Sequence, residues 1–211
     1  ALTVHKTFID ASASRLQHNL GLLMSGMVAG AFQSSTHREL LPDLWSSLFM
    51  VVPTVSTTFA SVRTMFGDLP PESIGWLLVD EAGQAVPQAA VGAIMRAKRS
   101  IVVGDPLQIP PVVSLPEKLN AEICKFFDID QVEWSAPAAS TQTLADQASR
   151  FKSTFVMDVG DREVGLPLLV HRRCQNPMFD VSNSIAYAGQ MVHAVGPKKP
   201  GSIGSALGRS H

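Results

Sequence analysis

The sequence predicts an α/β domain with three layers, in which helices cover a parallel sheet. Short apolar runs at 76–79 and 101–103 indicate buried strands, and the segment 87–98 between them is typical of a helix. A strand, a helix and a second strand in this order form a right-handed crossover with parallel strands. A third apolar run at 48–52, followed by a helix that ends near Met65, adds another unit of this kind.

Apolar spacing and helix-starting residues predict the other helices. Residues 5–27 place apolar side chains at helical period, which indicates a long helix that packs through one face. Ser34–Thr36 offers an N-cap to a short helix ahead of Pro42. Three further helices are expected at 117–127, 141–151 and 178–188, and the polar region between 128 and 161 indicates an insertion or a helical connection.

Composition and charge restrict the class of protein. The chain has 211 residues, 45% of them hydrophobic, which is enough for one large domain or one domain and part of a second. Its net charge of -1 creates no overall basic field, so any contact with nucleic acid must be local. No apolar run approaches the roughly 20 residues that cross a bilayer, so we expect no membrane contact.

The two cysteines favour a cytoplasmic protein with reduced thiols. Cys124 and Cys174 are far apart and show no CxxC spacing. His171, Cys174 and His193 do not have a zinc-binding spacing, and a fourth ligand is lacking. A structural zinc site is therefore not expected.

Acidic side chains follow both central strands directly. Asp80 and Glu81 come after the first strand, and Asp105 comes after the second. Because parallel strands end at the same edge, these acids should lie at the carboxyl edge of the sheet, where sites of open α/β sheets are found. An acid pair at a helix N-terminus, and a turn started by Asp105 and Pro106, are the structural alternatives.

The segments DEAGQ at 80–84 and GDPLQIPP at 104–111 resemble motifs II and III of superfamily 1 helicases. The resemblance is to the branch that includes the RNA helicase of nonsense-mediated decay and its DNA-acting relatives. It implies an ATP-hydrolysing protein that uses Mg²⁺ and acts on single-stranded DNA or RNA. It also implies a RecA-like P-loop NTPase fold.

The resemblance implies a role for each residue of these two motifs. Asp80 would hold the Mg²⁺, usually through water, and Glu81 would position and deprotonate the attacking water. Gln108 would sense the γ-phosphate of ATP, and Asp105 would help to fix the loop that carries Gln108.

The segment 168–192 resembles motif IV, which begins the second RecA-like domain with a Tyr-Arg pair. Arg173 corresponds to that arginine and would reach the γ-phosphate across the cleft. Arg172 stands where the aromatic ring would stack on the base, and a guanidinium can also stack. A basic turn on the surface is the structural alternative. Three later matches are Pro177, Asn183 and Tyr187.

The hydroxyl cluster Ser56, Thr57 and Thr58 resembles the motif with which these helicases contact the nucleic acid backbone. A plain helix N-cap explains the cluster equally well.

The resemblance also implies domain boundaries. Residues 1–165 would form part of the first RecA-like domain, with a helical insertion or connection near 117–160, and residues 166–211 would begin the second domain. The phosphate-binding loop GxxxxGK[ST] is absent, and its nearest candidate at 201–210 has neither the spacing nor the lysine. We therefore interpret the chain as a piece of a longer polypeptide that by itself hydrolyses ATP only at background rate.

Two other classes of protein fit the same residues. The first is a non-catalytic scaffold for nucleic acid or protein, built on a RecA-like domain. The second is a metal-dependent phosphohydrolase or nuclease that uses Asp80, Glu81 and Asp105 as ligands.

Overall fold

The protein is a mixed α/β chain with small sheets, seen in a computed structural model that describes residues 2–29, 35–105, 107–155 and 161–196. It divides into two compact units, Ala1–Gln142 (unit 1) and Thr143–His211 (unit 2). The glycine-rich segment 201–210 and the predicted cap at Ser34 lie outside the described residues.

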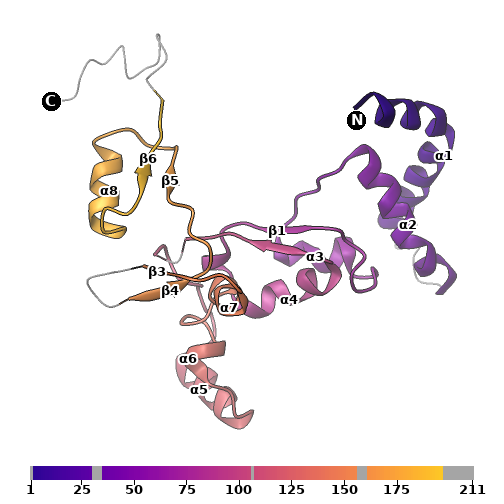
Figure 1. Cartoon of the computed structure of the whole chain (residues 1–211). Helices are drawn as coiled ribbons and strands as arrows, with labels where there is room; N and C mark the ends of the chain where they lie inside the picture. The colour runs from indigo at the N-terminus through magenta and orange to yellow at the C-terminus, as the bar shows by residue number, and fades with distance from the viewer. Residues whose placement is uncertain (1, 30–34, 106, 156–160, 197–211) are drawn as a thin grey trace. The chain divides into compact units, whose positions relative to one another are not determined.

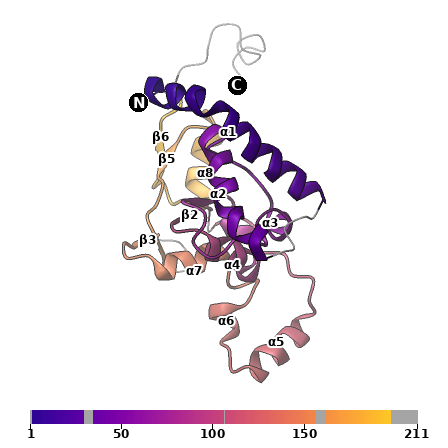
Figure 2. The same ribbon diagram turned by 90° about the vertical axis from the view of Figure 1, so that its right-hand side faces the viewer.

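Unit 1 begins with two long helices that pack side by side, α1 (Leu2–Ala29) and α2 (Ser35–Val51), as Figures 1 and 2 show. Asn19 Nδ2 on α1 donates a hydrogen bond to Ser47 Oγ on α2 over 2.9 Å. The predicted helix at 5–27 is confirmed. In the described ranges, neither α1 nor any other helix has the length and apolarity that crossing a membrane requires.

The predicted strand at 48–52 is wrong, because α2 continues through Pro42 to Val51. The short apolar run fits a strand and a helix equally well by its length. The residues before it decide between them: Leu41, Leu44 and Trp45 recur at helical spacing and are 3%, 7% and 3% exposed. A helix buries all three on one face, so the expected third strand–helix unit does not form in unit 1.

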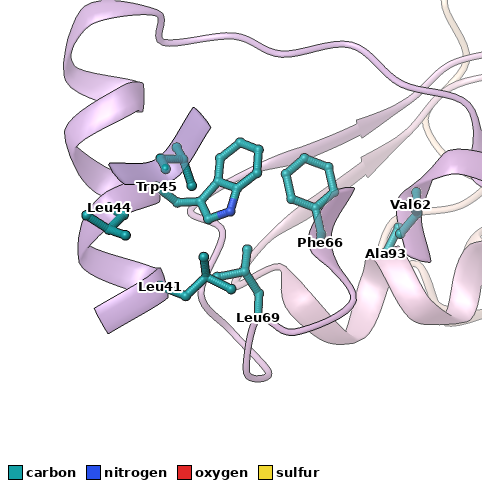
Figure 3. Packing of buried hydrophobic residues seen from close by; sticks show 8 residues of the cluster. Leu41, Leu44, Trp45, Val62, Phe66, Leu69 and Ala93 are labelled. Atoms are coloured by element: carbon teal, nitrogen blue, oxygen red, sulfur yellow. The ribbon is translucent and has the colours of Figure 1, made fainter. Parts of the chain in front are cut away.

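The core of unit 1 lies between α2 and the short helices α3 (Phe59–Phe66) and α4 (Pro87–Arg96). Figure 3 shows the indole of Trp45 against Phe66, and their ring centroids are 4.7 Å apart. The buried cluster consists of Leu23, Leu41, Leu44, Trp45, Val62, Phe66, Leu69 and Ala93. The hydrophobic burial of these side chains holds the helices together.

Arg96 joins the last turn of α4 to the end of α3. Its guanidinium donates through Nε to the Phe66 carbonyl at 2.6 Å and through Nη2 to the Gly67 carbonyl at 2.8 Å. Carbonyl groups at a helix end lack partners within the helix, so these charged hydrogen bonds satisfy them.

The sheet of unit 1 has two parallel strands in the described residues, β1 (Leu77–Val79) and β2 (Ser100–Val102). This pairing confirms the predicted parallel arrangement around α4. The expectation that both strands are buried is wrong, since Leu78 is 70% exposed and its partner Ile101 is 44% exposed. Leu77 packs on the core, so this sheet is covered on one face only and its burial alternates along the strand.

Two helices follow the sheet, α5 (Glu117–Phe126) and the single turn α6 (Gln131–Trp134). Asn120 Nδ2 donates to Ser135 Oγ at 2.9 Å and joins the start of α5 to the end of α6. The helix predicted at 117–127 is confirmed. The one predicted at 141–151 is present as the shorter α7 (Thr141–Ala148), which crosses from unit 1 into unit 2.

In its described residues, unit 2 contains two small sheets and one helix besides the part of α7 that follows Gln142. The strands β3 (Ser153–Phe155) and β4 (Arg162–Val164) are antiparallel, and β5 (Val170–His171) and β6 (Val192–His193) are parallel. The helix α8 (Met178–Ala186) precedes β6 and confirms the helix predicted at 178–188.

Asp146 on α7 anchors the chain at Gly165 in unit 2. Its Oδ1 accepts the Gly165 N–H at 2.9 Å, while its Oδ2 is buried without a hydrogen-bond partner among the described residues. Burial raises the pKa of Asp146 above its ordinary value of 3.8, although the Gly165 hydrogen bond and the charge of Arg162 act in the opposite direction.

We expect Phe66→Ala to lower the free energy of unfolding by about 3–5 kcal/mol, because it opens a cavity beside Trp45. Phe126→Ala is the matched control, since Phe126 is 81% exposed and Phe66 only 7%. Urea denaturation followed by circular dichroism measures both. Equal losses in the two variants would contradict the assignment of this core.

We expect Asp146→Asn to flatten the dependence of stability on pH. The folded pKa of Asp146 lies above 3.8, so between 3.8 and the folded pKa the folded state holds a proton that the unfolded state has already lost. The contribution of Asp146 to stability is therefore fully present below pH 3.8 and is lost as the pH rises through the folded pKa. Asparagine keeps the acceptor for Gly165 and does not ionise. Urea midpoints from pH 3 to 7 measure the effect, with the exposed Asp161→Asn as control.

Candidate functional site

Two loops leave the parallel sheet at one edge and are bonded to each other from their first residues. We call residues 80–86, after β1, the first acidic loop and residues 103–108, after β2, the second acidic loop. The Val103 N–H donates to the Val79 carbonyl at 2.8 Å, and the Ala82 N–H donates to the Val103 carbonyl at 3.0 Å. The backbone ladder therefore continues past the strands and fixes the starts of both loops.

Asp80 and Glu81 are both exposed at the start of the first acidic loop. Asp80 Oδ1 accepts the Glu81 N–H at 3.0 Å, and Glu81 Oε2 accepts Gln84 Nε2 at 3.2 Å. Glu81 has φ 53° and ψ 37°, a left-handed conformation that costs a residue with a side chain about 1 kcal/mol. It makes no side-chain capping bond to the 3₁₀ turn Ala82–Gln84 that follows. Strain of this kind gathers at functional sites.

Asp105 organises the second acidic loop. Its Oδ1 accepts the Leu107 N–H at 3.0 Å, and its Oδ2 accepts Gln108 Nε2 at 3.0 Å. The Gln108 N–H also donates to the Asp105 carbonyl at 3.2 Å. The carboxylate therefore holds both the backbone turn and the exposed amide of Gln108.

Two glycines let the acidic loops touch. A Cβ atom on Gly104 would lie 2.8 Å from the backbone nitrogen of Gly83 and 2.9 Å from that of Ala82. A Cβ atom on Gly83 would lie 3.0 Å from the Asp105 carbonyl oxygen. Any side chain at Gly104 would push the loops apart, so this contact requires glycine.

Thr141 and Gln142, at the start of α7, contact both acidic loops, and sequence reasoning assigned them no such role. The Thr141 N–H donates to the Ala85 carbonyl at 2.9 Å, and Gln142 Nε2 donates to the Gly104 carbonyl at 3.0 Å. Polar residues 56 and 38 positions away from their partners leave no periodic signal, so the sequence could not reveal them.

The hydroxyl cluster lies on the surface between α2 and α3. Ser56, Thr57 and Thr58 are exposed. Thr58 takes the N-cap position of α3 but its side chain makes no capping bond, and its Oγ1 donates to Ser61 Oγ at 3.3 Å. Thr58 therefore stands at the N-cap position as the capping alternative expects, but its hydroxyl does not cap the helix.

Arg172 and Arg173 are exposed residues of unit 2, in the bend between β5 and α8. The residues singled out in the sequence thus fall into two groups. The acids, Gln108 and the hydroxyl cluster belong to unit 1, and the two arginines belong to unit 2.

His171, Cys174 and His193 form a hydrogen-bonded group. His171 Nε2 accepts the Cys174 N–H at 2.8 Å, and His193 Nε2 lies 3.1 Å from the Cys174 carbonyl.

Within the described ranges, no three or more His, Cys, Asp or Glu side chains are arranged to hold a metal ion. That geometry gives no support to a metal site made of Asp80, Glu81 and Asp105 together.

Asp80 fits a magnesium ion of the kind that binds nucleotide phosphates. Such an ion needs only one or two carboxylates and completes its octahedron with water and phosphate oxygens. Asp80 is exposed and uses Oδ1 for the Glu81 N–H, while Oδ2 has no hydrogen-bond partner in the described part of the chain. Its carboxylate can therefore take a metal-bound water.

We expect Gly104→Ala to destabilise the fold by about 1–3 kcal/mol through overpacking, because the new methyl group meets backbone atoms that cannot rotate away. Gly75→Ala is the matched control, since a Cβ there has no atom within 4 Å. Adding Gln142→Ala should not rescue Gly104→Ala, because the contacts with Ala82 and Gly83 persist. Denaturation midpoints measure this, and full rescue would show that the amide alone causes the clash.

Residues 44–115 match the family model of an AAA domain. This segment contains β1, β2 and both acidic loops, and it ends ahead of Gln142 and Arg173. None of the curated proteins compared with the chain matches it. Residues 44–115 of the 211-residue chain are therefore similar to an AAA domain.

Proposed function

We propose that the chain is part of an ATP-dependent helicase or translocase that acts on single-stranded DNA or RNA. The observation that carries the proposal is the pair of acidic loops, bonded together at one edge of a parallel sheet within the AAA-domain segment. ATP hydrolysis needs Mg²⁺ on the phosphates, a group that orients water and cations that balance the developing charge. The carboxylates of these loops suit the first two needs.

In this proposal the first acidic loop holds the ion and the water. Asp80 would hold the Mg²⁺, partly through water, and Glu81 would orient the attacking water and take its proton. The Gln84 amide occupies Glu81 Oε2, so Oε1 is left for the water. The ion supplies charge stabilisation to the phosphates when it is bound.

The second acidic loop would detect the terminal phosphate. The amide nitrogen of Gln108 carries two hydrogens, and Asp105 Oδ2 accepts one of them at 3.0 Å. The second hydrogen can then be donated to a γ-phosphate oxygen. Asp105 thus sets the direction in which Gln108 senses the phosphate.

The exposed polar residues outside the acidic loops complete the proposal. Arg173 would contact the γ-phosphate with its permanently charged guanidinium, and Arg172 would stack on the base. The exposed hydroxyls of Ser56, Thr57 and Thr58 would contact the nucleic acid backbone.

The finer assignments belong to the same proposal. They are a cytoplasmic protein of the branch related to the RNA helicase of nonsense-mediated decay, and a three-layer RecA-like first domain over residues 1–165. Residues 166–211 would begin the second RecA-like domain.

The test is ATP hydrolysis by the full-length protein that contains this chain, with and without single-stranded nucleic acid. We expect Glu81→Gln to lower kcat by about 10²–10⁴-fold, because the amide cannot take a proton from water. Glu72→Gln is a closely matched control: Glu72 is an exposed glutamate with a left-handed backbone, at φ 59° against 53° for Glu81. It should retain wild-type turnover.

Each result of this assay has a definite meaning. Stimulated turnover that is lost in Glu81→Gln and kept in Glu72→Gln supports a motor protein. A folded wild type without turnover that still binds nucleic acid identifies a non-catalytic scaffold. Cleavage of DNA by divalent metal without ATP identifies a nuclease.

A further inference from the structure

We propose that Thr141 and Gln142 are positioning residues, which clamp the two acidic loops together from the start of α7. The inference deepens the proposed function, because the clamp would hold Glu81 and Gln108 in register for the reaction. It concerns residues that lie beyond the AAA-domain segment at 44–115.

The start of α7 is buried although it is polar. Ser140, Thr141 and Gln142 are 4%, 4% and 8% exposed, whereas such residues are mostly found at the surface. Burying polar groups is unfavourable unless they form hydrogen bonds. The partners of Thr141 and Gln142 therefore indicate what their burial achieves.

Thr141 binds the end of the first acidic loop. Its N–H donates to the Ala85 carbonyl at 2.9 Å, and its Oγ1 lies 3.3 Å from the carbonyl oxygens of both Ala85 and Val86. Val86 is the N-cap of α4. Thr141 thus fixes the point at which the loop becomes helix.

Gln142 binds the start of the second acidic loop. Its Nε2 donates to the Gly104 carbonyl at 3.0 Å, one residue before Asp105. Its Oε1 lies against both glycines, 2.3 Å from the place that a Cβ of Gly104 would take and 3.2 Å from that of Gly83. One amide therefore packs against both loops where they touch.

Burial of the Gln142 side chain costs free energy, so packing alone does not explain why a glutamine stands at this position. Its Oε1 is buried and has no hydrogen-bond partner in the described residues, whereas methionine of similar length would leave no unsatisfied acceptor. The hydrogen bond from Nε2 to Gly104 is the compensating contact. We attribute the glutamine to that bond, which ties the second loop to the helix that also holds the first.

Hydrogen exchange of the purified chain tests the clamp without any assay of activity. The reporters are the N–H groups of Ala82, bonded to Val103, and of Gln108, bonded to Asp105. Gln142→Met keeps the volume and removes the donor, so protection of both groups should fall about 2–10-fold, the equivalent of one hydrogen bond. Amides of α1 and α2 serve as the internal reference for folding.

Gln142→Glu makes the test specific for the donor. An ionised glutamate cannot donate to the Gly104 carbonyl, whereas the protonated acid can. Relative to wild type at the same pH, protection should be reduced at pH 7.5 and restored at about pH 3.3, one unit below the ordinary glutamate pKa of about 4.3. Gln142→Met should stay reduced at both pH values. Gln147→Met, an exposed glutamine on the same helix, should behave as wild type.

Thr141→Val provides an independent variant, because it removes the hydroxyl donor and keeps the shape. It should speed exchange in the first acidic loop and leave α1 unchanged. Wild-type protection in both Gln142→Met and Thr141→Val would overturn the clamp.

Turnover by the full-length protein separates this inference from the proposed function. If the protein hydrolyses ATP, Gln142→Met should lower kcat because it misplaces Glu81 and Gln108. The factor by which kcat falls should be at least about three times the factor by which the KM for ATP rises. If the protein has no turnover while the exchange results hold, the clamp stands and the ATPase proposal fails. Unchanged exchange overturns the clamp whatever the turnover.

Discussion

The close backbone contact between the two acidic loops is the constraint on which the candidate site depends. Parallel pairing of β1 and β2 brings the loops to one edge, and the Ala82 N–H bond to Val103 continues that pairing past the strands. Gly83 and Gly104 then allow approach to a distance at which a single Cβ would collide with backbone. Backbone contacts therefore determine how closely the loop that carries Asp80 approaches the loop that carries Asp105.

The helical core supports this edge from one side. Trp45 and Phe66 pack between α2 and α3, and Arg96 bonds the end of α3 to α4, the helix that connects β1 to β2. The other face of the sheet exposes Leu78 and Ile101. Glu81 can hold a left-handed backbone only where its surroundings resist relaxation. A rigidly packed core that supports a strained, exposed loop is a common arrangement at functional sites.

The sequence predicted the parts of the fold that local pattern determines. The helices at 87–98, 117–127 and 178–188 have their counterparts because amphipathic spacing and chain length fit one structure only. The run at 48–52 was misread as a strand, because five apolar residues fit either structure and the burial of Leu41 and Trp45 decides between them. The prediction that Leu78 is buried was wrong, because distant parts of the chain decide whether a face of the sheet is covered.

The sequence by itself determined the acids and their place at strand ends, because a short apolar run followed by Asp80 and Glu81, and by Asp105, is a local pattern. Only the tertiary structure decided how these loops are held. The contacts of Gln142 with Gly104 and of Thr141 with Ala85 join residues 38 and 56 positions apart. Such contacts form only when the chain folds so that the start of α7 lies against the loops after β1 and β2. The local sequence has no periodic pattern that would predict this packing.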